Sequence, residues 1–311
     1  MSGHAHAHHH GHGHGHAPGH HHHHAPPADG DWRYAVGIGL NLAFVAVEFG
    51  FGLWSRSTAL MADAGHNLSD VLGLALAGGA AWLARRAGSE RRTYGWGKAT
   101  ILAALVNAVV LVFACGAIAL EAVHRFLDPQ PVASGVVMGV AAAGFVINLG
   151  TALLFFRGRH DDLNARGAFL HMAADAGVSL GVVAAGVLIW FTGFSWIDPL
   201  ASLAIVAVVL LGAWGLLKES ADLAMDAAPP RIDMAELNAF LRSLPGVSAA
   251  HDVHVWSLST TETALTAHLV REQPGDDAFL ADALEQLRRR YRIDHATLQI
   301  ERSAQDACPH C

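Results

Sequence analysis

The sequence predicts an α-helical membrane protein with six transmembrane helices, followed by a small C-terminal α+β domain. The 311-residue chain is 52% hydrophobic and only 15% charged, whereas soluble domains carry about a quarter charged residues. Six long apolar stretches follow one another after residue 33. Beyond Lys218 the composition becomes that of an ordinary soluble domain. Most of the chain is therefore expected to contact lipid.

The first 32 residues are expected to be a disordered histidine-rich tail. They hold thirteen histidines among Gly, Ala and Pro. Such a segment has too few apolar side chains to offset the entropy of ordering. The tail is interpreted either as a low-affinity collector of metal ions or as a dispensable solvated segment, and its composition favours neither.

The transmembrane domain is expected over residues 33–220. Each apolar stretch has about the 20 residues that a helix needs to cross a bilayer core of roughly 30 Å. The stretches are 34–54, 58–84, 99–123, 132–156, 167–192 and 199–217. Basic residues concentrate in the second and fourth loops, and such an excess is typical of cytoplasmic loops. We therefore expect both termini in the cytoplasm. The basic residues of these two loops are Arg85, Arg86, Arg91, Arg92, Lys98, Arg157, Arg159 and Arg166.

The C-terminal domain is expected over residues 227–311. Apolar periodicity predicts two helices, and alternation of apolar and polar residues predicts three strands. The order helix-strand-strand-helix-strand predicts a small sheet with helices on one face. About 80 residues are marginal for an isolated core, so dimerisation is expected to help. The helices are expected at Met234–Leu244 and Ala278–Tyr291, and the strands at Val247–Leu258, Thr263–Val270 and Ile293–Glu301.

Composition also argues against several classes of protein. A net charge of −7 without a basic tract makes nucleic acid an unsuitable partner. Three cysteines give no disulfide framework. An intramembrane metalloprotease would need a motif such as His-Glu-x-x-His, which the sequence lacks. The chain is therefore not expected to be an enzyme.

Two pairs of ionisable residues lie inside apolar stretches. The segment ADAGHNLSD puts His66 and Asp70 one helical turn apart, and HMAAD puts His171 and Asp175 at the same spacing. An aspartate in mid-membrane costs at least about 2.5 kcal/mol, so both pairs need partners. If the two helices are neighbours, the four side chains offer two nitrogens and two oxygens. Zn²⁺ accepts such a tetrahedral set and Co²⁺ fits it too, whereas Cu⁺, Mg²⁺ and Ca²⁺ fit poorly.

The alternative interpretation is that each pair is an interhelical hydrogen bond, but two copies beside a histidine-rich tail favour metal binding. Glu48 and Asp63 are further acidic residues within apolar stretches. Asp63 is interpreted either as an outer waiting point for the released ion or for protons, or as a cap near the helix start.

The same residues resemble the cation diffusion facilitator family. The resemblance is carried by the six stretches, by ADAGHNLSD and HMAAD, by Asp198-Pro199 opening the last stretch, and by HDVHVWSL at His251–Leu258. It implies a homodimer with a ferredoxin-like cytoplasmic domain, in which each protomer exports metal by alternating access in exchange for protons. It also implies zinc selectivity, because family members with aspartate in place of the first histidine are more permissive toward cadmium.

The resemblance further implies regulatory zinc sites in the C-terminal domain. Their candidate ligands are His251, His268, His295 and Glu301, with the Cys308-x-x-Cys311 thiolates available to complete one site. His254 is three residues from His251 and is expected on the other face of the strand. The alternative is a solvated histidine surface.

Together these features predict a secondary transporter that exports Zn²⁺ against protons at His66, Asp70, His171 and Asp175. Co²⁺ and Cd²⁺ are further candidate substrates. A divalent-cation channel and a membrane zinc sensor without transport remain alternatives. Channels favour weak ligands, and a sensor needs no site in mid-membrane. The short loops and the absence of a recognisable targeting segment suggest a multi-pass protein of the bacterial inner membrane.

Overall fold

The computed structural model describes residues 32–129, 131–156, 163–272 and 277–302 of the chain. The histidine-rich tail and the pair Cys308 and Cys311 lie outside these ranges, so the predictions made for them stay predictions. The backbone of His171 belongs to a helix, but its side chain is outside the described part.

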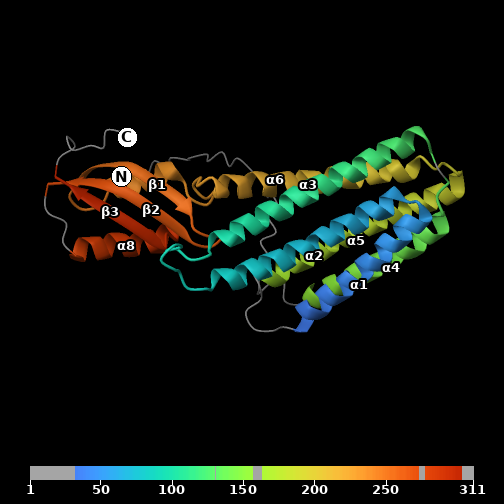
Figure 1. Cartoon of the computed structure of the whole chain (residues 1–311), viewed down its shortest axis with the longest axis horizontal. Coiled ribbons are helices and arrows are strands. Elements are labelled where there is room, and N and C mark those ends of the chain that lie inside the picture. The colour runs from blue at the N-terminus through green and yellow to red at the C-terminus, as the bar shows by residue number, and fades with distance from the viewer. Residues whose placement is uncertain (1–31, 130, 157–162, 273–276, 303–311) are drawn as a thin grey trace, which may run out of the picture.

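Six long helices make up the N-terminal two thirds of the chain and run side by side (Figure 1). They are α1 Trp32–Ser55, α2 Thr58–Ala84, α3 Lys98–Leu127, α4 Ser134–Phe156, α5 Leu163–Thr192 and α6 Ile197–Ala224. By length and composition, five of them (α2 to α6) contain a segment that can cross a membrane. In α1, which has 24 residues, the segment Leu42–Ser55 is also apolar. The prediction of an α-helical membrane domain is confirmed.

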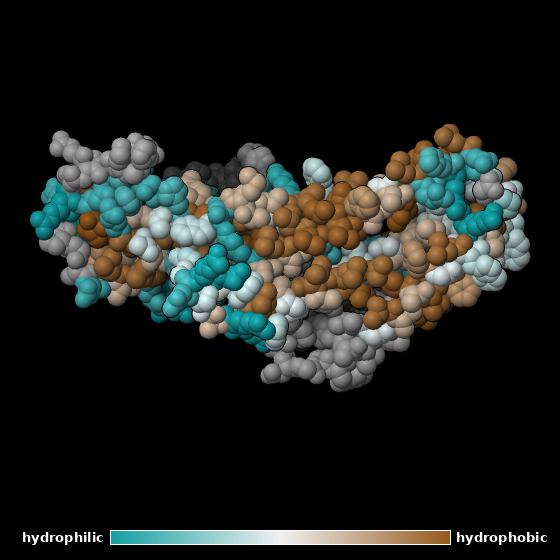
Figure 2. Space-filling view, viewed as in Figure 1, coloured by the Kyte–Doolittle hydropathy of each residue, from teal (hydrophilic) through white to brown (hydrophobic). Residues whose placement is uncertain are grey.

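The outer surface of these helices is apolar, as expected for a surface that faces lipid. Figure 2 shows hydrophobic residues along the helices and hydrophilic residues over the C-terminal domain. Large side chains such as Phe113, Leu211 and Trp214 are more than 60% exposed. In water such exposure would be unfavourable, so these helices need a bilayer around them.

A buried carboxylate joins two helix starts at the far end of the helices, which we define as the end away from the C-terminal domain. Asp198, in the first turn of α6, accepts hydrogen bonds from the hydroxyl of Ser57 and from both the backbone N–H (2.7 Å) and the hydroxyl (2.8 Å) of Thr58. Ser57 is itself the N-cap of α2 and accepts from the N–H of Leu60. The carboxylate therefore satisfies helix-start donors and fixes α2 against α6.

Replacing Asp198 by alanine is expected to destabilise the membrane domain by roughly 3 kcal/mol, because hydrogen bonds to a charged acceptor contribute about 1.5–3 kcal/mol each. Thermal unfolding in detergent measures the change. Thr192→Ala is the control, since the Thr192 hydroxyl donates to the carbonyl of Leu188 in its own helix and accepts from the N–H of Phe194, two residues on. Equal melting temperatures for Asp198→Ala and the wild type would contradict the assigned role.

The C-terminal domain is a three-stranded sheet with both helices on one face. It comprises α7 Met234–Arg242, β1 Val247–Ser257, β2 Thr263–Arg271, α8 Asp277–Tyr291 and β3 His295–Glu301. The strand order is β1-β2-β3, with β1 antiparallel and β3 parallel to β2. One core lies between sheet and helices, and its fully buried leucines are Leu237, Leu241, Leu265, Leu269 and Leu287. The predicted order and the α+β class are confirmed.

The near end of the helices rests on this domain. The Lys98 ammonium at the start of α3 is 2.5 Å from the Asp226 carboxylate, just after α6. The hydroxyl of Thr100 accepts from the N–H of Thr260 in the β1–β2 loop at 3.0 Å. A Cβ at Gly97 would lie 2.7 Å from the carbonyl oxygen of Leu258, so only glycine allows this approach.

Candidate metal-binding sites

The first candidate site lies inside the helix bundle, where α2 and α5 face each other. His66 is eight residues after the start of α2, which places it about 12 Å from that end at 1.5 Å per residue. Asp70 follows one turn later, on the same face. Asp175 on α5 faces this pair, so the neighbour relation expected between the two helices is present.

The ring of His66 stands between two carboxylates. Its Nε2 is 3.4 Å from Asp175 Oδ1, and its Nδ1 is 3.7 Å from Asp70 Oδ2. Ligands on a tetrahedral zinc ion with bonds of about 2.0 Å are roughly 3.3 Å apart, so the His66–Asp175 spacing suits one ion. The three residues offer ligand atoms that all lie within 4.8 Å of one another.

The three candidate ligands differ in how deeply their side chains are buried. The side chain of Asp175 is 1% exposed, whereas those of His66 and Asp70 are 19% and 30% exposed. His66 and Asp70 therefore form the more accessible side of this candidate site, and Asp175 forms its buried side. His171 precedes Asp175 by one helical turn, but its side chain lies outside the described part, so its place as a fourth ligand stays a prediction.

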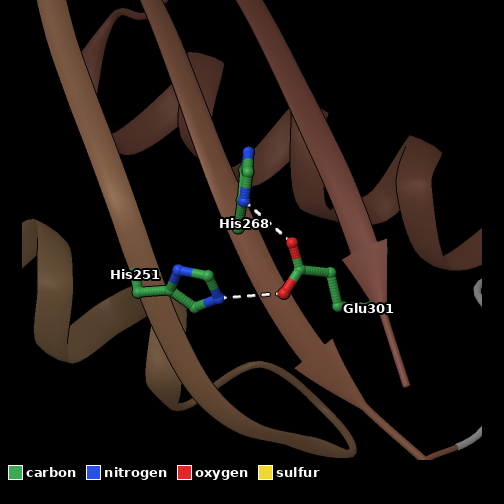
Figure 3. A group of neighbouring side chains, drawn as sticks. All are labelled: His251, His268 and Glu301. Carbon is green, nitrogen blue, oxygen red and sulfur yellow. Dashed lines mark hydrogen bonds and ion pairs between the residues drawn. The ribbon is translucent and has the colours of Figure 1, made fainter. Parts of the chain in front are cut away.

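The second candidate site lies on the sheet of the C-terminal domain, on the face opposite its helices. Figure 3 shows His251 from β1, His268 from β2 and Glu301 from β3 pointing toward one another. One carboxylate oxygen of Glu301 is 3.0 Å from His251 Nε2 and the other is 2.8 Å from His268 Nδ1. Glu301 is 6% exposed. Two imidazoles and a buried carboxylate are suitable ligands for zinc.

His254 lies on the same face as His251, so the sequence-based expectation for it was wrong. His251 pairs with His268 and His254 pairs with Thr266, which means that the two residues between them on β1 oppose a single residue of β2. The bulge is at Asp252, whose φ is +50°. One carboxylate oxygen of Asp252 is 2.7 Å from His254 Nε2 and the other is 3.4 Å from His268 Nε2. Alternation alone cannot reveal this inserted residue.

His295 is not brought to the second site. It is exposed, opens β3 at the end opposite Glu301, and its ring stands 5.9 Å from that of Tyr94 in the α2–α3 loop. At about 3.3 Å per residue, six residues separate it from Glu301 by roughly 20 Å. His251, His268 and Glu301 therefore come together and His295 does not.

Two residues near these sites were not singled out from the sequence. Ser179 on α5 donates a hydrogen bond of 2.9 Å to Asp63, and Asp252 bridges two histidines. Ser179 follows Asp175 by one turn, and that spacing could have identified it as a neighbour of the first site.

Comparison with known proteins covers both domains. Residues 34–223 match the cation efflux transmembrane domain, and residues 229–303 match the cytoplasmic domain of cation efflux proteins. The zinc transporter ZitB of Escherichia coli (strain K12) is 39% identical over 253 residues, covering 80% of each chain. The cation efflux system protein CzcD of Alcaligenes sp. (strain CT14) is 34% identical over 252 residues, again covering 80% of each. A "cadmium, cobalt and zinc/H(+)-K(+) antiporter" of Bacillus subtilis (strain 168) is 33% identical over 262 residues, 81% of this chain and 83% of its own.

Proposed function

Because this chain belongs to the cation efflux family, also called the cation diffusion facilitator family, we propose that it exports Zn²⁺ from the cytoplasm in exchange for protons. It is a multi-pass membrane transporter and not an enzyme, in agreement with its relatives. Zn²⁺ is the substrate, and the printed name of the Bacillus subtilis relative adds Co²⁺ and Cd²⁺ as further candidates.

The observation that carries this proposal is the position of His66 between Asp70 and Asp175 inside the bundle. A nitrogen and two carboxylates suit zinc better than the oxygen-only cages preferred by Mg²⁺ and Ca²⁺. With His171 as the fourth ligand, the site would be the two-histidine, two-aspartate set that the sequence predicts.

Proton exchange follows from the chemistry of the ligands. Imidazole and carboxylate bind a metal only when deprotonated, so zinc and protons compete for the same atoms. A carrier that opens alternately to the two sides converts this competition into exchange. The antiporter name of the Bacillus subtilis relative supports this choice.

The direction of transport rests on topology. The C-terminal domain matches the cytoplasmic domain of the family, so the near end of the helices lies at the cytoplasmic surface. The basic residues of the α2–α3 loop lie at that end, as the positive-inside rule requires. The far end with Asp198 then faces outward, and in a bacterium the membrane is the inner one.

Zinc uptake into inverted membrane vesicles tests the proposal. A proton gradient, acid inside, is expected to drive zinc accumulation, and a protonophore is expected to abolish it. A channel would instead pass zinc down its own gradient without regard to pH. A membrane sensor would accumulate none under either condition. Either result would contradict zinc/proton antiport.

We further propose that His251, His268 and Glu301 hold a regulatory zinc ion in the cytoplasmic domain of a homodimer. Their three ligand atoms lie within 4.8 Å of one another. Zinc takes four ligands, and a water molecule or a thiolate of the Cys308-x-x-Cys311 end can supply the fourth. His295 would belong to a different site, since it lies at the other end of β3.

Replacing His268 by alanine is expected to remove about one zinc ion per chain, because two ligands alone bind zinc weakly. Equilibrium dialysis of the purified full-length transporter measures the loss. His254→Ala is the control, since His254 is 65% exposed and contacts Asp252 rather than Glu301. Equal zinc content in His268→Ala and the wild type would contradict this site.

A further inference from the structure

Two buried acidic residues lie one helical turn beyond the metal site, toward the far end. Glu48 on α1 and Asp63 on α2 are both 0% exposed. The two carboxyl groups are close enough to interact electrostatically. One oxygen of each, Glu48 Oε1 and Asp63 Oδ1, is buried without a hydrogen-bond partner among the described residues. Asp63 precedes His66 by three residues, so the pair and the metal site are stacked along the same face of α2.

Two neutral side chains hold this pair in place. The Ser179 hydroxyl donates to Asp63 Oδ2 at 2.9 Å, and the Asn67 amide donates to Glu48 Oε2 at 3.3 Å. Ser179 and Asn67 are themselves at most 1% exposed. Ser179 follows Asp175 by one turn of α5, so both helices that carry metal ligands also hold the acidic pair.

Among the described residues, no lysine or arginine balances the charge of this pair, and the basic side chain near it is the imidazole of His66. Helices α2 and α4 contain no lysine or arginine, and those of α1 and α5, Arg33 and Arg166, lie near the cytoplasmic ends. Two ionised carboxylates in contact repel each other strongly in a dry interior. A carboxylate is an acceptor only, so a hydrogen bond between two carboxyl groups requires a proton on one of them.

We propose that Glu48 and Asp63 share one proton and form a proton-binding site that is separate from the metal ligands. The inference rests on the proposed zinc/proton exchange. The proton would leave when a divalent ion occupies the neighbouring metal site, because the two positive charges repel across one helical turn. Its return from the outside would in turn promote release of the ion. Such a site couples zinc flux to proton flux although the proton and the zinc ion bind to different atoms.

The other ionisable groups that face the pair are few. In the part of the chain that the structure describes, they are His66 on α2 and Asp175 on α5. Both are candidate metal ligands of the first site. Helix α4 contributes no ionisable residue. A change in proton coupling in a Glu48 variant therefore has two possible causes, the loss of the shared proton or an indirect effect on the metal site. Measuring zinc binding distinguishes them, because only the second cause changes zinc affinity.

The test measures zinc influx and proton counterflow together in proteoliposomes that hold a zinc dye and a pH dye. In Glu48→Gln and Asp63→Asn, the number of protons exchanged per zinc ion is expected to fall by about one, because the pair holds one proton. Zinc affinity at equilibrium is expected to change far less than in Asp175→Asn.

Glu121→Gln is the matched control, because Glu121 on α3 pairs with Arg125 outside this cluster. It is expected to leave the ratio unchanged. An unchanged ratio and pH dependence in Glu48→Gln and Asp63→Asn would show a purely structural pair and overturn the proposal. Zinc flux could also be measured with K⁺ in the buffer and with choline as an inert replacement. If the flux required K⁺, the pair would bind an alkali ion instead of a proton, and the proposal would be overturned. A wild type without any proton counterflow would instead refute the exchange itself.

Discussion

Zinc transport by the Asp175→Asn variant is expected to fall by roughly a hundredfold or more. Asp175 is 1% exposed and faces His66 Nε2 at 3.4 Å. Removing one partner of a buried charged pair costs about 3–5 kcal/mol, and each 1.4 kcal/mol is a factor of ten. Asparagine keeps the shape of the side chain but removes the negative charge that attracts the ion.

The measurement is the initial rate of proton-driven zinc uptake in vesicles, with zinc binding determined in parallel. Asp198→Asn is the comparison, since Asp198 is equally buried but touches Ser57 and Thr58 rather than His66. That variant is expected to be less stable, but the fraction that remains folded is expected to bind zinc at the membrane site. Zinc uptake at the wild-type rate in Asp175→Asn would remove Asp175 from the transport site.

The membrane helices could be predicted from the sequence because lipid imposes a simple length rule on apolar residues. The ends were harder to place. The last span was expected over 199–217, but α6 continues through Lys218 and Glu219 to Ala224. These polar residues favour helix as much as apolar ones do, so a helix can continue beyond the apolar stretch.

The first site could be predicted in part, because a spacing of four residues places His66 and Asp70 on one face of any helix. The facing position of Asp175 needed the packing of α2 against α5. The contacts of Asp63 with Ser179 and of Asp198 with Ser57 join residues 116 and 141 positions apart. No local pattern contains such partners, although the cost of burying each carboxylate signals that one must exist.

The second site shows where a periodic rule fails. Strand alternation put His254 on the wrong face because it assumes that each residue of β1 opposes one of β2. The bulge at Asp252 adds one residue and returns His254 to the side of His251. Bulges are common next to functional sites, where they redirect side chains. Here the bulge brings a carboxylate between two histidines.

Replacing His66 by aspartate is expected to raise cadmium transport relative to zinc transport several-fold. The change exchanges the nitrogen ligand between Asp70 and Asp175 for carboxylate oxygens and leaves a shorter side chain in the same place. A small tetrahedral zinc ion loses a ligand of suitable length and geometry. Cadmium is larger and accepts more oxygen ligands at longer distances, so it tolerates the widened site, as relatives with aspartate at this position are expected to do.

Competition between the two ions for uptake into the same vesicles measures this ratio. His254→Asp is the matched control, because it makes the same change in the cytoplasmic domain, away from the membrane site, and is expected to leave the ratio at the wild-type value. If His66→Asp retained the wild-type preference for zinc, His66 would not determine selectivity. The preference would then have to come from Asp70 and Asp175 together with His171, whose side chain would be the next to replace.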